Sequence, residues 1–252
     1  MSSLSHTIDA DGIALVTLAN PPMNALTTAV LEETAGLFQR LTGDPAVRAA
    51  VVTGAGRAFS AGLDLKLAPT LDEAGQRRLV AALNDCYGTL YAWPKPLVAA
   101  VNGHCIAGGL VLALCGDARL AADLPLQVSL AEVRVGVTFP AAALEVARGE
   151  LAPAAARRLM LLGEVFDAAA AVALGVFDGL VPAADLAARA HAEALRHAAL
   201  PAEAFATIKA ELRAPRLERI AAARAGLGEP RLDRWFGEEM RRAAAAVLRG
   251  GR

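Results

Sequence analysis

The stretch HCIAGGLVLALCGD, residues 104–117, places two glycines at the start of an apolar run with helical character. Glycine inside a helix costs roughly 0.5–1 kcal/mol relative to alanine, so Gly108 and Gly109 weaken the helix that they open. A helix that begins at Gly108 leaves its first N–H groups without partners in the helix, and the helix dipole favours negative charge there. The stretch therefore predicts a place where a ligand oxygen can approach the backbone.

A second glycine loop ends an earlier strand in the same way. The apolar run VRAAVVTGAG, residues 47–56, leads into RAFSAGLDLK, residues 57–66, which turns through small residues. Two such loops facing each other would form an oxyanion hole with two donors, each worth about 2.7–4 kcal/mol to the transition state. Either loop alone also fits an ordinary strand-to-helix turn. Neither fits a nucleotide loop, because GAGRAF, residues 54–59, lacks the third glycine and no Gly-Lys-Ser/Thr follows.

Composition and charge exclude several functional classes. The chain has 252 residues and a formal net charge of -1, which argues against a nucleic-acid-binding or membrane-surface protein. Cys86, Cys105 and Cys115 lack Cys-x-x-Cys spacing and are expected to be reduced, buried thiols. Residues 1–20 show no signal-peptide pattern, and no apolar run reaches the ~18 residues of a membrane span. We expect a cytoplasmic protein without a metal or a bound cofactor.

Alternating patterns of strand and helix predict an α/β fold. From about residue 140 the pattern becomes helical almost to the end of the chain. We expect strands at 12–20, 47–56, 96–103, 117–122, 126–130 and near 176–182, and helices at 27–42, 71–93, 184–198, 202–213 and 230–249. An α/β core is therefore followed by a helical C-terminal region.

Taken together, the motifs resemble those of the crotonase (enoyl-CoA hydratase/isomerase) superfamily. The resemblance covers roughly residues 8–215 and rests on NPPMNAL (20–26), FSAGLDLK (59–66), AAVNGHCIAGGLVLALCGDARLAA (99–122), LAEVRVGVTFP (130–140) and ALGVFDGLVP (173–182). It implies a spiral of ββα turns at 1–195, a helical trimerisation region at 196–252, and a homotrimer or a dimer of trimers. It also implies a coenzyme A thioester as substrate, as in fatty acid β-oxidation.

Carried over by position, the resemblance implies that the backbone N–H groups of Leu63 and Gly108 are the oxyanion donors. It implies that the acyl-CoA channel is lined by Met23, Ala25, Ala61, Gly62, Asp64, Leu65, Lys66, Ala107 and Gly109. Arg57 and Lys66 match positions where the family often has basic residues near the CoA phosphates. Both also fit simple surface charges.

The number of acidic residues at the site distinguishes hydration of a double bond from isomerisation. Hydratases of this family use two glutamates, and one of them lies one turn beyond the oxyanion glycine, where this chain has Val111. The other position matches Glu132. A single base suffices to move a double bond from C3 to C2, by removing a C2 proton and returning it at C4. The motifs also look more like those of mitochondrial-type Δ3-Δ2-enoyl-CoA isomerases, so we expect an isomerase with Glu132 as its base, whose pKa burial would raise.

Two other hypotheses stay open. One is a hydratase, or another crotonase reaction, in which a second acid such as Glu145 takes part. The other is a protein that binds acyl-CoA without turnover. Asp64, His104 and Asp117 are expected to be structural, and His191 and His197 to face solvent. Ser60 lacks the Gly-x-Ser-x-Gly context of a serine hydrolase, which argues against such a triad.

Overall fold

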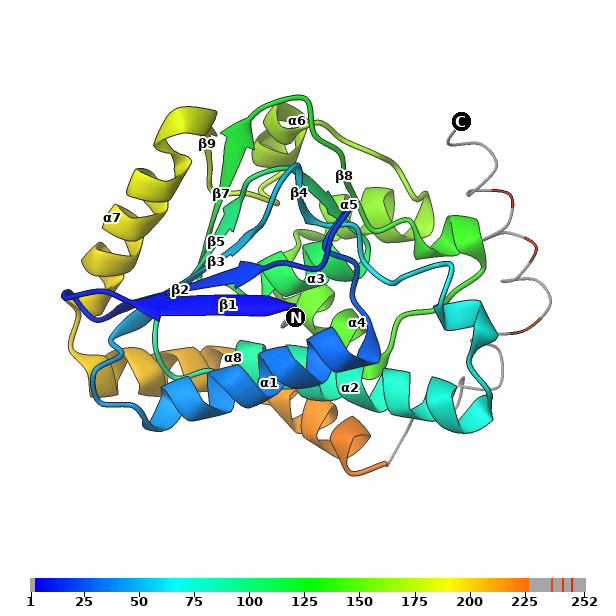
Figure 1. The fold of residues 1–252 in the computed structure, drawn as a ribbon, viewed down its shortest axis with the longest axis horizontal. Helices are drawn as coiled ribbons and strands as arrows, with labels where there is room; N and C mark the ends of the chain where they lie inside the picture. The colour runs from blue at the N-terminus through cyan, green and yellow to red at the C-terminus, as the bar shows by residue number, and fades with distance from the viewer. Residues whose placement is uncertain (1–2, 227–236, 238–241, 243–245, 247–252) are drawn as a thin grey trace.

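The computed structural model describes residues 3–226 and, beyond them, residues 237, 242 and 246. The helix expected at 230–249 therefore lies outside the described residues, and that expectation stays a prediction. Within them the α/β class is confirmed, and each of the other expected strands and helices is present (Figure 1).

A six-stranded sheet lies at the centre, in the order β1-β2-β3-β5-β7-β9. β1 runs antiparallel to β2, whereas the other pairs are parallel. β3 and β5 are buried almost throughout, as expected of parallel strands that are covered on both faces. The strands are β1 (Leu4–Ile8), β2 (Ile13–Leu18), β3 (Ala49–Gly54), β5 (Leu97–Val101), β7 (Ala118–Asp123) and β9 (Gly179–Pro182).

A second, smaller parallel sheet brings the two glycine loops together. It contains β4 (Ala58–Ser60), β6 (His104–Ile106) and β8 (Val128–Ser129), with β6 in the middle. Each of these strands directly follows one strand of the larger sheet, and a helix comes after each pair. The chain thus makes three successive ββα turns, as the resemblance implied. Because β4 and β6 are neighbours, the loops that follow them meet.

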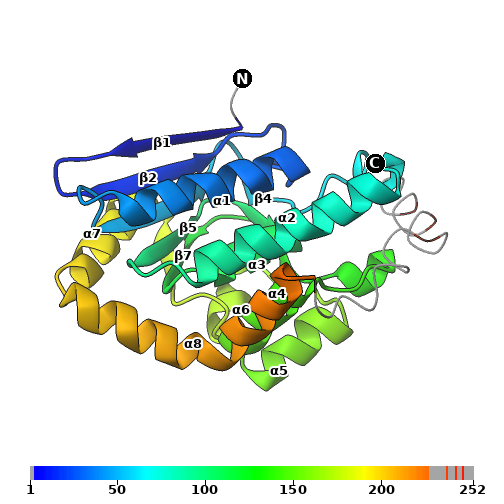
Figure 2. The same cartoon turned by 90° about the horizontal axis from the view of Figure 1, so that it is seen from below.

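Helices cover both faces of the larger sheet (Figures 1 and 2). α1 and α2 pack side by side on one face, while α7 contacts β3 and β5 on the other. Side chains alternate accordingly, since Val52 belongs to the main core cluster and Val51 to the cluster under α7. The helices are α1 (Thr28–Gly43), α2 (Glu73–Tyr91), α3 (Gly108–Leu114), α4 (Ala141–Glu150), α5 (Pro153–Ala156), α6 (Ala168–Ala173), α7 (Leu186–Ala198) and α8 (Ala202–Arg224), with short turns η1 (Ala68–Thr70), η2 (Glu132–Val135), η3 (Arg157–Leu161) and η4 (Ala183–Asp185).

The helix starts follow the sequence signals. Thr27 accepts a hydrogen bond from the Val30 N–H at the start of α1, and Asp72 does the same for Gly75 at the start of α2. Such N-caps satisfy donors that a helix leaves without partners. α2 packs beside α1, and its side chains Leu83 and Tyr87 reach a cavity.

α8 is longer than its sequence pattern suggested. It passes through Pro215 and ends at Arg224 instead of near residue 213. The extra turns bury Ile220 and Ala223 while α8 packs against α2 and α4. Burial of an apolar face stabilises this extension, although proline removes one hydrogen bond from it.

The cysteine prediction is confirmed. Cys86, Cys105 and Cys115 are free and buried, and burial raises the pKa of each thiol. Within the described part of the chain, every helix is too short or too polar to span a lipid bilayer.

Candidate active site

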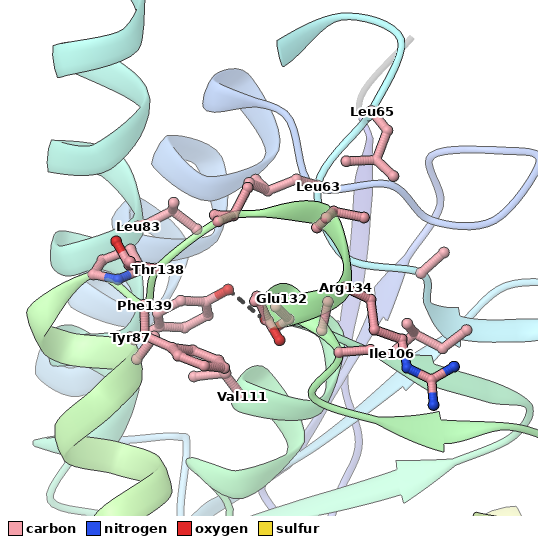
Figure 3. Close-up of a pocket in the computed structure, with 18 residues that line it drawn as sticks. Leu63, Leu65, Leu83, Tyr87, Ile106, Val111, Glu132, Arg134, Thr138 and Phe139 are labelled. Carbon is pink, nitrogen blue, oxygen red and sulfur yellow. Dashed lines mark hydrogen bonds between the residues drawn. The ribbon is translucent and has the colours of Figure 1, made fainter. Parts of the chain in front are cut away.

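A mostly apolar cavity of about 270 Å³ opens where the loops after β4 and β6 meet α2, η2 and the start of α4 (Figure 3). Its polar side chains come from Tyr87, Glu132, Arg134 and Thr138. The lining is made by Ala61, Leu63, Leu65, Leu83, Tyr87, Ile106, Ala107, Gly108, Val111, Ala131, Glu132, Arg134, Val135, Val137, Thr138, Phe139, Pro140 and Ala143.

Gly62 allows the first loop to touch the second. Its φ of +77° lies in the region that glycine adopts readily. A Cβ at this position would lie 2.9 Å from the Ile106 carbonyl oxygen and 3.1 Å from the Gly108 nitrogen. The backbone of Leu63 follows directly, so its N–H lies beside the start of α3.

The second loop fixes the direction of the Gly108 N–H. The Ala107 carbonyl accepts hydrogen bonds from the N–H groups of Leu110 (2.9 Å) and Val111 (3.2 Å), while the Ala107 N–H donates to Ser129 at 2.7 Å. A trans peptide is planar, so the Gly108 N–H points away from the Ala107 carbonyl and out of the helix. This donor therefore faces away from α3.

Both N–H groups are unpaired. Within residues 3–226, neither Leu63 nor Gly108 donates its N–H to a protein acceptor. Both residues line the cavity. Two neighbouring amide donors at the N-terminus of a helix are what an oxygen with growing negative charge requires. The geometry thus matches the pair of donors that the sequence indicated.

Glu132 supplies the carboxylate. It begins η2, and its Oε2 atom is buried without a hydrogen-bond partner among the described residues. Removal from water raises the pKa of this carboxyl to about 8, against a weaker opposing effect of a hydrogen bond from its own backbone N–H. The residue as a whole is only half-buried, but its carboxyl oxygen is not exposed. A carboxyl with such a pKa can both accept and return a proton near neutral pH.

The cavity holds one carboxylate in the part of the chain that the structure describes. Val111 contributes an aliphatic side chain to the cavity wall, as the sequence indicated. Glu145 does not line it. Instead, this buried side chain forms ion pairs with Arg148 of α4 (3.1 Å) and Arg219 of α8 (3.3 Å). This placement argues against Glu145 as a second acid, because its charge is paired with two arginines and its side chain is not part of the cavity wall.

The predicted binding residues divide into two groups. Ala61, Leu63, Leu65, Ala107 and Gly108 line the cavity together with Glu132. The cavity wall does not include Met23, Ala25, Gly62, Asp64, Lys66 or Gly109.

The residues of the second group support the loops. The Met23 carbonyl accepts from Ala61 (3.0 Å), the Ala25 carbonyl accepts from Asn20 (2.7 Å), and Asp64 accepts from the backbone N–H groups of Lys66 and Leu67. Gly109 packs on Ser60, since a Cβ there would lie 2.4 Å from the Ser60 carbonyl. Gly62 and Gly109 serve close packing of the backbone, which the sequence does not distinguish from contact with a ligand. Lys66 and Arg57 are exposed, and their role toward CoA phosphates stays a prediction.

Ser60 and two of the expected structural residues have clear partners. The Ser60 hydroxyl donates to the Asn24 carbonyl at 2.7 Å, and His104 Nδ1 accepts from the Gln127 N–H at 3.1 Å. Asp117 accepts from the Leu97 N–H and pairs with Lys209 at 2.7 Å. The structural assignments of His104 and Asp117 are confirmed.

The two histidines of α7 differ from each other. His191 is partly exposed and lies 2.6 Å from Asp9. The expectation that His197 faces solvent is wrong, because its side chain is only 13% exposed. It packs against Phe205 at the start of α8 instead. The sequence of α7 alone could not show that α8 would cover this side chain.

Much of the cavity wall was not singled out from the sequence. Leu83 and Tyr87 stand four residues apart on α2 and reach the cavity from one helix face. Thr138 and Phe139 lie at the end of the quoted motif LAEVRVGVTFP, and Arg134 lies within it. The helical spacing of α2 could have indicated Leu83 and Tyr87, although it does not separate a cavity wall from ordinary core.

A spiral of ββα turns that brings two unpaired amide donors to a buried carboxyl defines an enzyme of the crotonase type. The chain belongs to the enoyl-CoA hydratase/isomerase family, whose profile matches residues 9–227. This agrees with the resemblance drawn from the motifs.

The individual relatives include proteins named as hydratases and proteins named as isomerases. The chain is 33% identical over 215 residues to the probable enoyl-CoA hydratase echA17 of Mycobacterium avium, covering 84% of this chain and 83% of that protein. It is 30% identical to the human mitochondrial enoyl-CoA delta isomerase 1, covering 84% of this chain and 71% of that protein. The crystal structure of human mitochondrial delta3-delta2-enoyl-CoA isomerase superimposes with a TM-score of 0.90 at 28% identity, covering 99% of this chain and 98% of that one.

Proposed function

We propose that this protein is an enoyl-CoA isomerase that converts 3-enoyl-CoA into 2-enoyl-CoA with Glu132 as its single base. The observation that carries the proposal is the composition of the cavity wall. Among the described residues that line it, Glu132 is the one carboxylate, and Val111 stands where hydratases of the family have a second glutamate. Hydration of a double bond needs a water activated and a proton delivered, a task that hydratases of the family divide between two carboxylates. A shift of the double bond needs one group only.

The reaction uses Glu132 twice, as base and then as acid, and the oxyanion donors between these two steps. Glu132 takes a proton from C2 of the 3-enoyl thioester, and the C–H electron pair spreads over C2, C3 and C4 and onto the thioester oxygen. The N–H groups of Leu63 and Gly108 hold that oxygen while it bears the charge. Glu132 then gives the proton to C4, which leaves the double bond between C2 and C3. The apolar wall excludes water, which would otherwise protonate the intermediate or add to the conjugated product.

The rate is expected to rise with pH through the pKa of Glu132. Only the ionised carboxylate can remove the C2 proton, and burial holds its pKa at about 8. We expect kcat/KM to increase roughly tenfold per pH unit below 8 and to level off above it. Initial rates between pH 5.5 and 9.5 measure this. A rate that stays constant across this range would show that the carboxyl is hydrated in the free enzyme and not buried as described.

A paired assay separates the isomerase from a hydratase. One cuvette holds 3-enoyl-CoA and reports the appearance of the conjugated thioester, and the other holds 2-enoyl-CoA and reports its loss by hydration. We expect conjugation without comparable hydration. Hydration at a similar or greater rate would show that a second acid takes part and that Val111 does not mark isomerase chemistry. Tight acyl-CoA binding without either reaction would indicate a binding protein.

A further inference from the structure

Tyr87 is a buried part of the cavity wall for which the reaction above has no role. Its side chain extends from α2 and is 1% exposed. The hydroxyl donates a hydrogen bond to the Gly108 carbonyl oxygen at 3.0 Å. Figure 3 shows this hydroxyl directed into the cavity beside Glu132. Burial raises the pKa of Tyr87 well above its usual range, so the phenol keeps its proton and stays a donor.

The first turn of α3 is held by the helix's own backbone hydrogen bonds, in which the Gly108 carbonyl is an acceptor, and by the Tyr87 hydroxyl. No side chain caps this helix of seven residues, and Ala107 before it has a positive φ of 52°. Two glycines in succession, Gly108 and Gly109, leave the backbone of that turn freer than any other residues would. In the described part of the chain, the Tyr87 hydroxyl is the side-chain group that bonds to Gly108.

We propose that Tyr87 is a positioning residue of the oxyanion hole. The peptide before Gly108 is held through the Ala107 carbonyl, and the peptide after it is held through the Gly108 carbonyl by α3 itself and, in addition, by Tyr87. Fixing both peptides fixes the two torsion angles of Gly108, and with them the direction of its N–H. A donor that is already aimed at the developing charge stabilises it without reorganisation. The proposal rests on the proposed use of the Gly108 N–H, but not on whether the reaction is isomerisation or hydration.

Tyr87→Phe tests the proposal because it removes one hydroxyl and keeps the ring. We expect kcat to fall about tenfold, the size of effect that loss of one hydrogen bond produces, while KM stays within about twofold. Tyr91→Phe is the matched control. Tyr91 lies one turn further along α2, is equally buried, and stacks under Arg213 at 4.1 Å outside the cavity. This control should keep the kcat of the parent even if it melts at a lower temperature.

A second readout follows the oxyanion hole without turnover. A 3-ketoacyl-CoA enolises when its thioester oxygen is stabilised, and the enolate absorbs in the near ultraviolet. We expect the parent and Tyr91→Phe to bind it as enolate, and Tyr87→Phe to show a smaller enolate fraction at saturation. If 3-enoyl-CoA is not turned over, the proposed function fails, but this absorbance still tests Tyr87.

Three results would overturn the proposal. The first is a Tyr87→Phe enzyme with the kcat and enolate absorbance of the parent. The second is an equal loss in Tyr87→Phe and Tyr91→Phe, which would indicate general loosening of α2. The third is a fall in kcat with an unchanged enolate fraction, because the hydroxyl would then not act through the oxyanion hole. A parent enzyme that forms no enolate would likewise contradict the proposal, because its site would then not stabilise the thioester oxygen.

Gly108→Ala gives an independent check on the same bond. A Cβ at Gly108 would lie 2.6 Å from the Tyr87 hydroxyl, so the substitution displaces that hydroxyl. In the Gly108→Ala background, Tyr87→Phe is therefore expected to change the enolate fraction by less than twofold. A further loss as large as in the parent would contradict the proposal, since the bond is already broken there.

Discussion

Glu132→Gln is expected to lower kcat by about 10²- to 10⁴-fold, the contribution that a positioned general base makes to a proton transfer. Glutamine keeps the shape and the polarity of the side chain but cannot accept the C2 proton. The affinity for acyl-CoA should change little, because the oxyanion donors and the apolar wall remain. Steady-state rates with 3-enoyl-CoA, together with binding of a saturated acyl-CoA, measure the two effects separately.

The same variant tests whether the carboxyl is buried. An acid whose pKa is raised in the folded state, here to about 8 from 4.5, binds more protons folded than unfolded between these two values. The parent therefore loses stability as pH rises from about 4.5 to 8. Glu132→Gln lacks this loss, so its melting temperature should exceed that of the parent more at pH 8 than at pH 5. An equal difference at both pH values would contradict the burial of the charge.

Glu145→Gln is the control for this prediction. Glu145 is also a buried glutamate, on the helix α4 whose first turn lines the cavity, but its charge is paired with Arg148 and Arg219. We expect its substitution to leave kcat within about twofold of the parent. A Glu132→Gln enzyme that keeps a tenth of the parental kcat, or a Glu145→Gln enzyme that loses as much as Glu132→Gln, would contradict the single-base mechanism.

The elements that the sequence predicted well are those with a local signal. Thr27 marks the start of one helix, and the apolar runs that became β3 and β5 mark buried strands. The two glycine loops were recognisable because a close approach of backbones requires glycine, as the contacts of Gly62 show. Such signals lie within a few neighbouring residues, so they can be recognised without knowledge of the fold.

The strand and the side-chain positions that the sequence did not predict depend on contacts between distant segments of the chain. Strand β1 is exposed along most of its length and shows no apolar alternation. His197 is covered by α8, and Glu145 is turned away from the cavity by its two arginines. Tyr87 reaches Gly108 across 21 residues of sequence. None of these contacts has a local pattern, because each one is decided by how two helices or a helix and a loop pack.

Gly62→Ala is expected to lower kcat by about 10²- to 10³-fold, as for the loss of an oxyanion donor. The new Cβ would lie 2.9 Å from the Ile106 carbonyl oxygen and 3.1 Å from the Gly108 nitrogen. These are backbone atoms that cannot move aside as a side chain can, so the two loops must separate. The Leu63 N–H then no longer points at the oxygen that the Gly108 N–H holds.

Gly56→Ala separates this effect from backbone strain. Gly56 has nearly the same left-handed conformation, with φ of +73° against +77°, but a Cβ there meets no atom within 4 Å. Both variants should lose roughly 1–2 kcal/mol of stability from the strained alanine, measured by urea unfolding. Only Gly62→Ala should also lose kcat and the enolate absorbance of a bound 3-ketoacyl-CoA. If both variants kept the parental kcat, the contact between the two loops would not shape an oxyanion hole, and the catalytic role of Leu63 and Gly108 would be wrong.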